Sequence, residues 1–187
     1  VRMLRAIRFQ AKFDFSLENA TAKPIAQLAP LLKQISAPRL FDEVLKLFLS
    51  GKGKKTFQLM EEYSLFAPLF PATGKLLSHQ NEASNRFHSL IVSALENTDH
   101  RIQQDKPVTP AFLYAALLWP RVLIISEQYQ QQGEARFRAL QLAGHQALDE
   151  QMPVIAIPKR FSIPMREIWT LQHRLETAHG KRAIGVL

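Results

Sequence analysis

The apolar residues of this 187-residue chain recur every three or four positions, which is the spacing of one face of an α-helix. Stretches that alternate apolar and polar residues, as half-buried strands do, are almost absent. Residues that commonly start or end helices, such as proline and glycine, separate the periodic segments. The segments predicted as helices are residues 1–13, 21–35, 38–49, 54–65, a region from about 84, 111–118, two segments on either side of Gly133, and 165–179. The pattern therefore predicts an all-α, multi-helix fold with no sheet.

Prolines interrupt this helical pattern in two places. LFAPLFPATG, which begins at Leu65, holds two prolines and a glycine. It predicts a boundary between a domain of residues 1–72 and a domain of residues 73–187. PVIAIPKRFSIP, which begins at Pro153, is predicted to be a connector before the last helix.

The predicted helix at the start of the chain, VRMLRAIRFQAKFDF, has a basic face about 120° wide and an apolar face opposite it. The basic residues are Arg2, Arg5, Arg8 and Lys12. The apolar residues are Leu4, Ile7 and Ala11. Phe9 and Phe13 lie beside the basic face, where a guanidinium can bind a phosphate and a phenyl ring can stack on a base. Two interpretations are open: this face binds a nucleic acid or nucleotide, or it pairs with carboxylates elsewhere in the protein.

The most informative feature of the composition is the distribution of charge along the chain. The net charge is +8, and residues 1–60 carry eleven Lys or Arg against four Asp or Glu. A second basic excess follows Pro158. This asymmetry indicates a polyanionic partner, RNA or DNA before a membrane, although a basic helical protein without such a partner fits equally well.

Two other features of the composition exclude classes of site. The chain has no Cys, which excludes disulfides and thiolate metal sites. Its longest apolar run, AFLYAALLWPRVLII, contains Pro120 and Arg121. It therefore predicts two buried helices rather than one that spans a membrane.

The first helix also resembles a known family. VRMLRAIRFQAKFDF is similar to the neck helix of bacterial poly(A) polymerases and of their relatives, the CCA-adding tRNA nucleotidyltransferases, in which Glu-Asp-x-x-Arg is followed by Met-Leu-Arg-Ala-x-Arg-Phe. The resemblance implies that Arg2 and Arg5 contact the incoming nucleotide. It also implies that Arg8 and Phe9 have structural roles. Because the Glu-Asp pair would precede Val1, we expect the chain to lack the N-terminal catalytic head of these enzymes.

Three longer blocks extend the resemblance to the neck and body of poly(A) polymerases, which favours this branch over the CCA-adding enzymes. These blocks are APRLFDEVLKLFLSGKGKKTFQLMEEYSLFAPLFP, NTDHRIQQDKPVTPAFLYAALLW and AIPKRFSIPMREIWTLQHRLETAHGKRA. In the first block, Arg39 and Glu43 are four residues apart and are predicted to pair along a helix.

Several basic residues are predicted to contact the RNA backbone, with solvent-exposed charge as the alternative. They are Lys12, Lys52, Lys54, Lys55, Lys159, Arg160, Lys181 and Arg182. The lysines of SGKGKKT do not indicate a nucleotide-binding phosphate loop, because the spacing is incomplete and the segment joins two helices.

The resemblance implies that the full-length protein is a polynucleotide adenylyltransferase, which adds AMP from ATP to RNA 3′ ends with Mg²⁺. The five aspartates of this chain are isolated, so we expect the catalytic carboxylates to come from the head and this part alone to be inactive, with no metal or cofactor of its own. The expected partners are ATP, the RNA 3′ end and the missing head, with no membrane, in a cytoplasmic protein. The alternatives are part of a CCA-adding enzyme, or a non-enzymatic helical module that binds RNA or protein.

Overall fold

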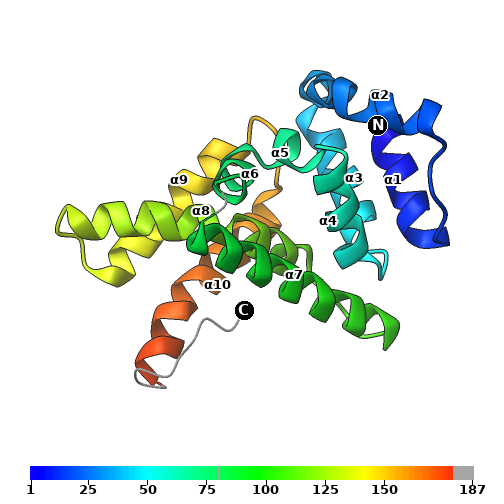
Figure 1. Ribbon diagram of the computed structural model, residues 1–187. Helices are drawn as coiled ribbons and strands as arrows, with labels where there is room; N and C mark the ends of the chain where they lie inside the picture. Colours follow the sequence, from blue (N-terminus) through cyan, green and yellow to red (C-terminus); the bar gives the residue numbers. More distant parts are fainter. Residues whose placement is uncertain (80, 179–187) are drawn as a thin grey trace.

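A computed structural model describes residues 1–79 and 81–178. In these residues every regular element is a helix, which confirms the predicted all-α class (Figure 1). The elements are α1 (Arg2–Phe13), α2 (Asn19–Leu28), the 3₁₀ helix η1 (Ala29–Gln34), α3 (Ala37–Phe48), α4 (Gly53–Glu62), α5 (Phe66–Leu69), α6 (Pro71–Leu77), α7 (Glu82–Gln103), α8 (Pro110–Gln131), α9 (Arg136–Gln151) and α10 (Lys159–Ala178).

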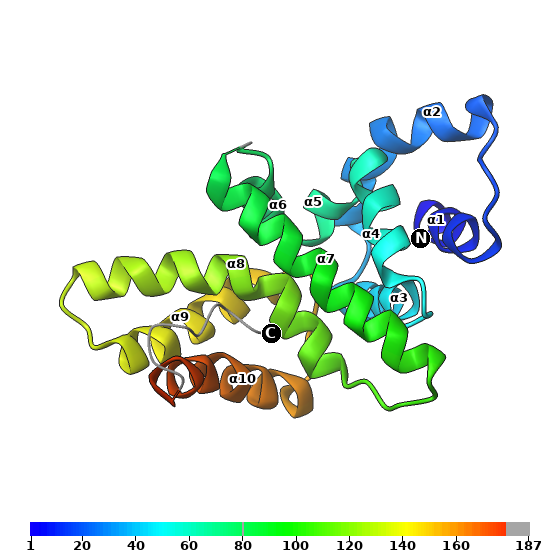
Figure 2. The ribbon, with the colours of Figure 1, turned by 60° about the horizontal axis from the view of Figure 1, so that its bottom comes forward.

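Helix α8 lies at the centre of the molecule and packs against α6, α7, α9 and α10, whereas α1 and α3 pack on α4 at the N-terminal side (Figures 1 and 2). One hydrophobic core joins both sides. Leu4, Phe48, Tyr114 and Trp169 are all fully buried members of it. Buried side chains from both sides of residue 72 belong to this core. The predicted division into two domains at residue 72 stays a prediction.

The proline-rich segment that begins at Leu65 forms two short helices, α5 and α6, where we predicted a break. Its apolar side chains Leu65, Phe66, Leu69 and Phe70 are buried in the core. A Cβ on Gly74 would lie 2.7 Å from Cα of Ala67, so the two short helices cross at a distance that only glycine permits. The prolines and glycine therefore mark a tight helical corner.

Helix α8 corrects the prediction of two separate helices, because it runs through Pro120 without a break. A proline inside a helix costs about 3 kcal/mol through the lost hydrogen bond and the steric clash. Burial of the apolar residues on both sides of Pro120 offsets this cost. By length and composition α8 could cross a membrane, but two thirds of its most apolar window is buried inside this fold.

Several helices begin or end where the capping residues in the sequence predict a boundary. Thr109 caps α8 by accepting a hydrogen bond of 3.2 Å from the backbone amide of Ala111. Gly51 follows α3 with a φ of 75°, and Gly133 lies between α8 and α9 with a φ of 97°. The last helix was predicted too short, because α10 begins at Lys159, inside the expected connector.

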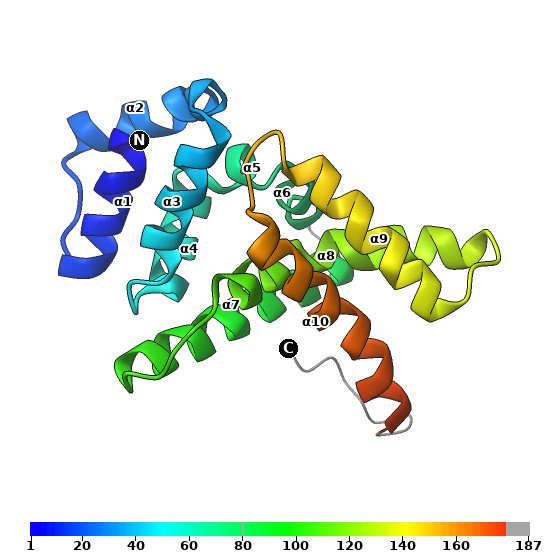
Figure 3. The same ribbon diagram turned by 180° about the vertical axis from the view of Figure 1, so that it is seen from behind.

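The start of α10 lies against α3, although the two are far apart in the sequence. The backbone amide of Ala156 donates a hydrogen bond of 3.2 Å to the carbonyl oxygen of Ala37. The ring of Phe161 stacks on that of Phe41, with 5.8 Å between centroids. In Figure 3, α3 lies between α1 and the start of α10.

Candidate nucleic-acid interface

Helix α1 presents the faces that its sequence predicts. Its apolar residues Leu4, Ile7 and Ala11 are buried against α3 and α4. Its basic residues lie on the outside: Arg2, Arg5 and Lys12 are exposed, and Arg8 is half-buried. The packing of one side of the helix therefore fixes the basic side toward solvent.

The exposed side of α1 also carries a strip of stacked rings and cations. The rings of Phe9 and Phe13 stack with 6.0 Å between centroids, and 61% of Phe13 is exposed. The Arg8 guanidinium lies 5.2 Å from the Phe9 ring, and the Lys12 ammonium lies 5.4 Å from the Phe13 ring. We call Arg8, Phe9, Lys12 and Phe13 the α1 strip. Exposed phenyl rings beside fixed cations can stack on bases while the cations bind phosphates.

Glu43 of α3 is the buried carboxylate nearest to this basic side. It accepts a hydrogen bond of 3.2 Å from Lys46, and its carboxylate lies 3.9 Å from the Arg5 guanidinium. The predicted pair with Arg39 is wrong, because the Glu43 side chain points toward α1 and Lys46. Arg39 is exposed, and within the described part of the chain it has no carboxylate within 4.0 Å.

The SGKGKKT segment leads into α4, and the beginning of that helix is already occupied by a carboxylate. Asp99 of α7 accepts hydrogen bonds from the backbone amides of Gly53 and Lys54, at 2.6 and 3.0 Å. A Cβ on Gly53 would lie 2.9 Å from the carbonyl oxygen of Phe48, so this position requires glycine. The amides that a phosphate loop would use are satisfied by Asp99, which supports the rejection of a phosphate loop.

The three lysines of this segment differ in their surroundings. Lys54 forms an ion pair of 3.0 Å with Glu96, and Lys55 forms one with Asp14. The hydrogen bonds from these lysines lower the pKa of Glu96 and of Asp14 below their ordinary values. Lys52 is exposed and has no ion-pair partner among residues 1–79 and 81–178. It is therefore the lysine most available to a phosphate.

The second predicted basic cluster is placed close to α3 by the fold. Lys159 and Arg160 are exposed at the start of α10, and the Arg160 guanidinium lies 4.9 Å from the ring of Phe161. Lys181 and Arg182, which were predicted with them, lie outside the described residues.

Sequence reasoning missed a polar groove between α9 and α10. It has a volume of about 280 Å³ and is lined by Arg138, Gln141, His145 and Arg166, among others. Nη1 of Arg166 lies 2.9 Å from Nε2 of His145. No pattern in the sequence pairs two residues that are 21 positions apart on different helices.

The described residues contain no group of three or more His, Asp or Glu side chains that could hold a metal ion. The interface consequently offers binding groups for phosphates, bases and carboxylates, and it lacks the paired carboxylates of a two-metal site.

Comparison with known proteins gives matches along nearly the whole chain. Residues 14–77 match a family described as "Probable RNA and SrmB- binding site of polymerase A", and residues 132–187 match one described as "Polymerase A arginine-rich C-terminus". The chain is 42% identical over 184 residues to Poly(A) polymerase I of Salmonella typhimurium, and 43% identical over 177 residues to Poly(A) polymerase I of Haemophilus influenzae. These alignments cover 98% and 94% of this chain, but 39% and 38% of the relatives.

The similarity to CCA-adding enzymes is more limited. The CCA-adding enzyme of Lactobacillus gasseri is 35% identical over 65 residues, which cover 35% of this chain and 16% of that enzyme. The much longer alignments favour the polymerase branch. The chain spans about two fifths of the length of the poly(A) polymerases it matches.

Proposed function

Since this chain belongs to the poly(A) polymerase family, we propose that its full-length protein adds AMP from ATP to RNA 3′ ends and that this helical part binds the RNA. The observation that carries the RNA role is the α1 strip, in which exposed phenyl rings alternate with cations on an anchored helix. Similarity to Poly(A) polymerase I over nearly the whole chain supports the adenylyl transfer.

In this proposal Arg2 and Arg5 contact the ATP. Both are exposed on the same side of α1, and guanidiniums provide planar, permanently charged donors for a base edge or a phosphate. The buried Glu43 carboxylate, 3.9 Å from Arg5, limits the positions that this guanidinium can take. These donors would orient the nucleotide, while the reacting groups are held elsewhere in the protein.

The chemistry itself is assigned to the N-terminal catalytic head of the full-length enzyme. Nucleotidyl transfer requires carboxylates that hold Mg²⁺ at the attacking hydroxyl and at the leaving pyrophosphate. The described residues provide no such cluster. We therefore expect this part alone to bind RNA and to leave ATP unreacted.

The RNA would extend from the α1 strip across α3, where Arg39 is exposed, to the start of α10, where Lys159 and Arg160 are exposed (Figure 3). The hydrogen bond between Ala156 and Ala37 and the stacking of Phe161 on Phe41 hold the start of α10 against α3, which itself packs on α1. Contacts of this kind to phosphates depend little on base sequence, which suits a polymerase that works without a template.

The description of the family that matches residues 14–77 names SrmB beside RNA. We propose that this region also contacts a protein partner. A cytoplasmic location without a membrane partner is part of the same proposal.

The test is an extension assay of the full-length protein with labelled oligo(A), ATP and Mg²⁺. Addition of many adenylates, with no use of CTP on a tRNA that lacks its CCA end, is the expected result. Addition of CTP to that tRNA would favour the CCA-adding branch. Failure to extend either RNA would favour a non-enzymatic binding module.

A further inference from the structure

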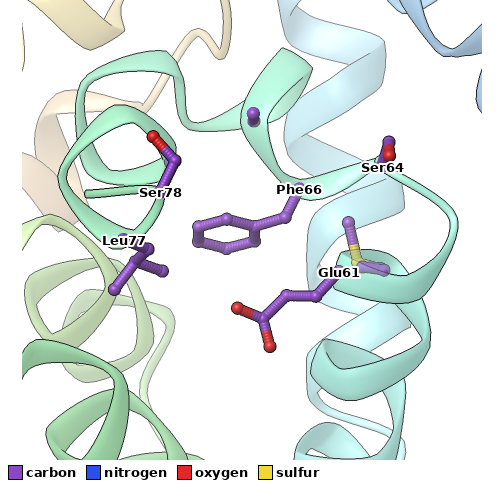
Figure 4. Close-up of a pocket in the computed structure, with 8 residues that line it drawn as sticks. Glu61, Ser64, Phe66, Leu77 and Ser78 are labelled. Atoms are coloured by element: carbon purple, nitrogen blue, oxygen red, sulfur yellow. The ribbon is translucent and has the colours of Figure 1, made fainter. Parts of the chain in front are cut away.

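A small pocket with an acidic rim opens between α4, α5 and α6 (Figure 4). Its volume is about 240 Å³, and its apolar surface includes Met60, Phe66 and Leu77. Glu61, Ser64 and Ser78 supply polar atoms. Figure 4 shows the Phe66 ring lying between the side chains of Leu77 and Glu61. The pocket is smaller than the roughly 300–1,000 Å³ of typical small-molecule sites, so it suits a single side chain better than a cofactor.

The walls of the pocket are held in place by contacts on several elements. Gly74 of α6 approaches Ala67 of α5 so closely that a Cβ would lie 2.7 Å from the Ala67 Cα. The ring of Phe66 packs edge-on against that of Phe57, with 4.9 Å between centroids. The pocket is therefore a preformed feature of the helical corner.

The Glu61 carboxylate is held by a contact to one of its two oxygens, while the other oxygen can still accept a hydrogen bond. Its Oε2 lies 3.0 Å from Nε2 of His88 on α7. Its Oε1 has no hydrogen-bond partner in the described part of the chain, and about a third of the side chain is exposed. A positioned carboxylate with an open acceptor beside an aromatic ring is complementary to a guanidinium, which donates planar hydrogen bonds and stacks on rings.

The charge around the pocket differs from that of the rest of the chain. Residues 61–82 carry three glutamates and one lysine, in a chain whose net charge is +8. A phosphate in the pocket would be repelled by the Glu61 carboxylate that lines it. In Figures 1 and 2, α4 separates α6 from α1, so an occupant of the pocket leaves the α1 strip uncovered.

We propose that this pocket receives an arginine side chain of a protein partner, with the guanidinium on Glu61 and the alkyl stem over Phe66 and Leu77. This inference rests on the proposed function, because it specifies how residues 14–77 and the adjoining Ser78 contact a protein while RNA lies on α1. A protein partner is favoured over RNA because, among residues 1–79 and 81–178, the only charged group that lines the pocket is a carboxylate.

The test uses the full-length protein labelled with ¹³C at the methionine ε-methyl groups. Met60 lines the pocket, whereas Met3 lies on α1 and Met152 directly follows α9, and these two serve as internal references. Met60→Leu assigns the signal. The probe is N-acetyl-arginine amide, with N-acetyl-norvaline amide as the uncharged comparator. The arginine probe should shift the Met60 signal in a saturable way, and the norvaline probe should shift it much less.

Two variants test the role of the carboxylate. Glu61→Gln keeps the shape of the side chain and should weaken binding of the arginine probe by at least roughly five-fold, because a charge-assisted hydrogen bond becomes a neutral one. Glu62→Gln is the matched control, since Glu62 is exposed on the same helix and does not line the pocket. Binding to Glu62→Gln should equal binding to the unmodified protein. The unchanged signals of Met3 and Met152 report that each variant is folded.

Three results would overturn the inference: no saturable shift of Met60, equal binding by Glu61→Gln and the unmodified protein, or an equal loss in Glu62→Gln. A shift of Met60 caused by oligo(A) would also overturn it, in favour of RNA. Anisotropy of labelled oligo(A) on the same sample tests the proposed function separately. RNA binding without a response to arginine contradicts this inference alone, and a response to arginine without RNA binding contradicts the RNA role alone.

Discussion

The buried carboxylate of Asp99 accepts a hydrogen bond of 2.6 Å from the backbone amide of Gly53, although the two residues are 46 positions apart. Asp99 lies on α7, and Gly53 is the first residue of α4. The second oxygen accepts from the amide of Lys54 at 3.0 Å. The first amides of a helix have no partner within it, so α7 completes α4 and the two helices are coupled through one side chain.

Asp99→Ala should destabilise the fold by about 1–3 kcal/mol, because it leaves the Gly53 amide buried without an acceptor. The measurement is the midpoint of urea unfolding, compared with the unmodified protein. Asp149→Ala is the control, since Asp149 is exposed on α9 and its removal should change stability by about 0.5 kcal/mol or less. Equal midpoints for the two variants would contradict the structural role of Asp99.

Arg121 of α8 donates two hydrogen bonds, of 2.7 and 2.8 Å, to the Glu150 carboxylate of α9. These bonds lower the pKa of Glu150 below its ordinary value. A carboxylate with a lowered pKa in the folded state stabilises the fold above the pKa of the unfolded chain, and this stabilisation is lost as the pH falls through the folded value.

Glu150→Gln should therefore lower stability at pH 7 by less than about 1 kcal/mol, since the pair is partly exposed and solvent screens it. The difference should shrink as the pH falls below about 4.3, the ordinary pKa of a glutamate, and it should be lost once the pH is below the lowered pKa of the folded carboxylate. Thermal melts of both proteins from pH 3 to pH 7 measure this difference. Glu127→Gln, an exposed position of α8, should show little difference at any pH. A gap that stays constant with pH would contradict the assignment.

Phe13→Ala tests the α1 strip. Because 61% of Phe13 is exposed, the variant should fold normally. Loss of a ring that stacks on a base should weaken binding of oligo(A) by about 1–3 kcal/mol, measured by fluorescence anisotropy. Phe137→Ala removes another exposed ring, on α9, and should bind as the unmodified protein does. Equal affinities for all three proteins would remove the strip from the RNA surface.

Lys52 and Lys54 make a matched pair for the salt dependence of RNA binding. Lys52 is exposed and without an ion pair in the described residues, whereas Lys54 already contacts Glu96. Lys52→Gln should reduce the slope of log affinity against log salt by about 0.7, the value for one phosphate of a single strand. Lys54→Gln should reduce it less. The opposite order would show that the ion pair with Glu96 opens when RNA binds.

The faces of α1 were predictable because they depend on one helix alone. Once the period is 3.6 residues, Leu4 and Ile7 must lie opposite Arg2, and the structure buries the first two and exposes the third. Pro120 misled the prediction because local propensity favours a break there, while burial of the apolar residues around Pro120 outweighs it.

Contacts between distant segments carried no local signal. In the sequence Asp99 is an isolated aspartate. Its role as the acceptor for the first amides of α4 depends on the packing of α7 against α4. Glu61 and its neighbour Glu62 look alike in the sequence, yet only Glu61 meets His88 and lines a pocket. Such relationships depend on how helices cross, which the pattern of a single segment does not determine.

Arg2→Ala in the full-length enzyme tests the nucleotide role of α1. A hydrogen bond to a charged group contributes about 1.5–3 kcal/mol, so its loss should raise the KM for ATP by roughly ten-fold or more. The affinity for oligo(A) should change much less, because the proposed partner of Arg2 is the nucleotide and the α1 strip remains intact. Steady-state extension at varied ATP and anisotropy with RNA measure the two effects on the same preparation. Lys23→Ala, an exposed cation on α2, controls for the loss of one positive charge. Equal losses in ATP use and RNA binding would place Arg2 on the RNA surface instead of at the nucleotide.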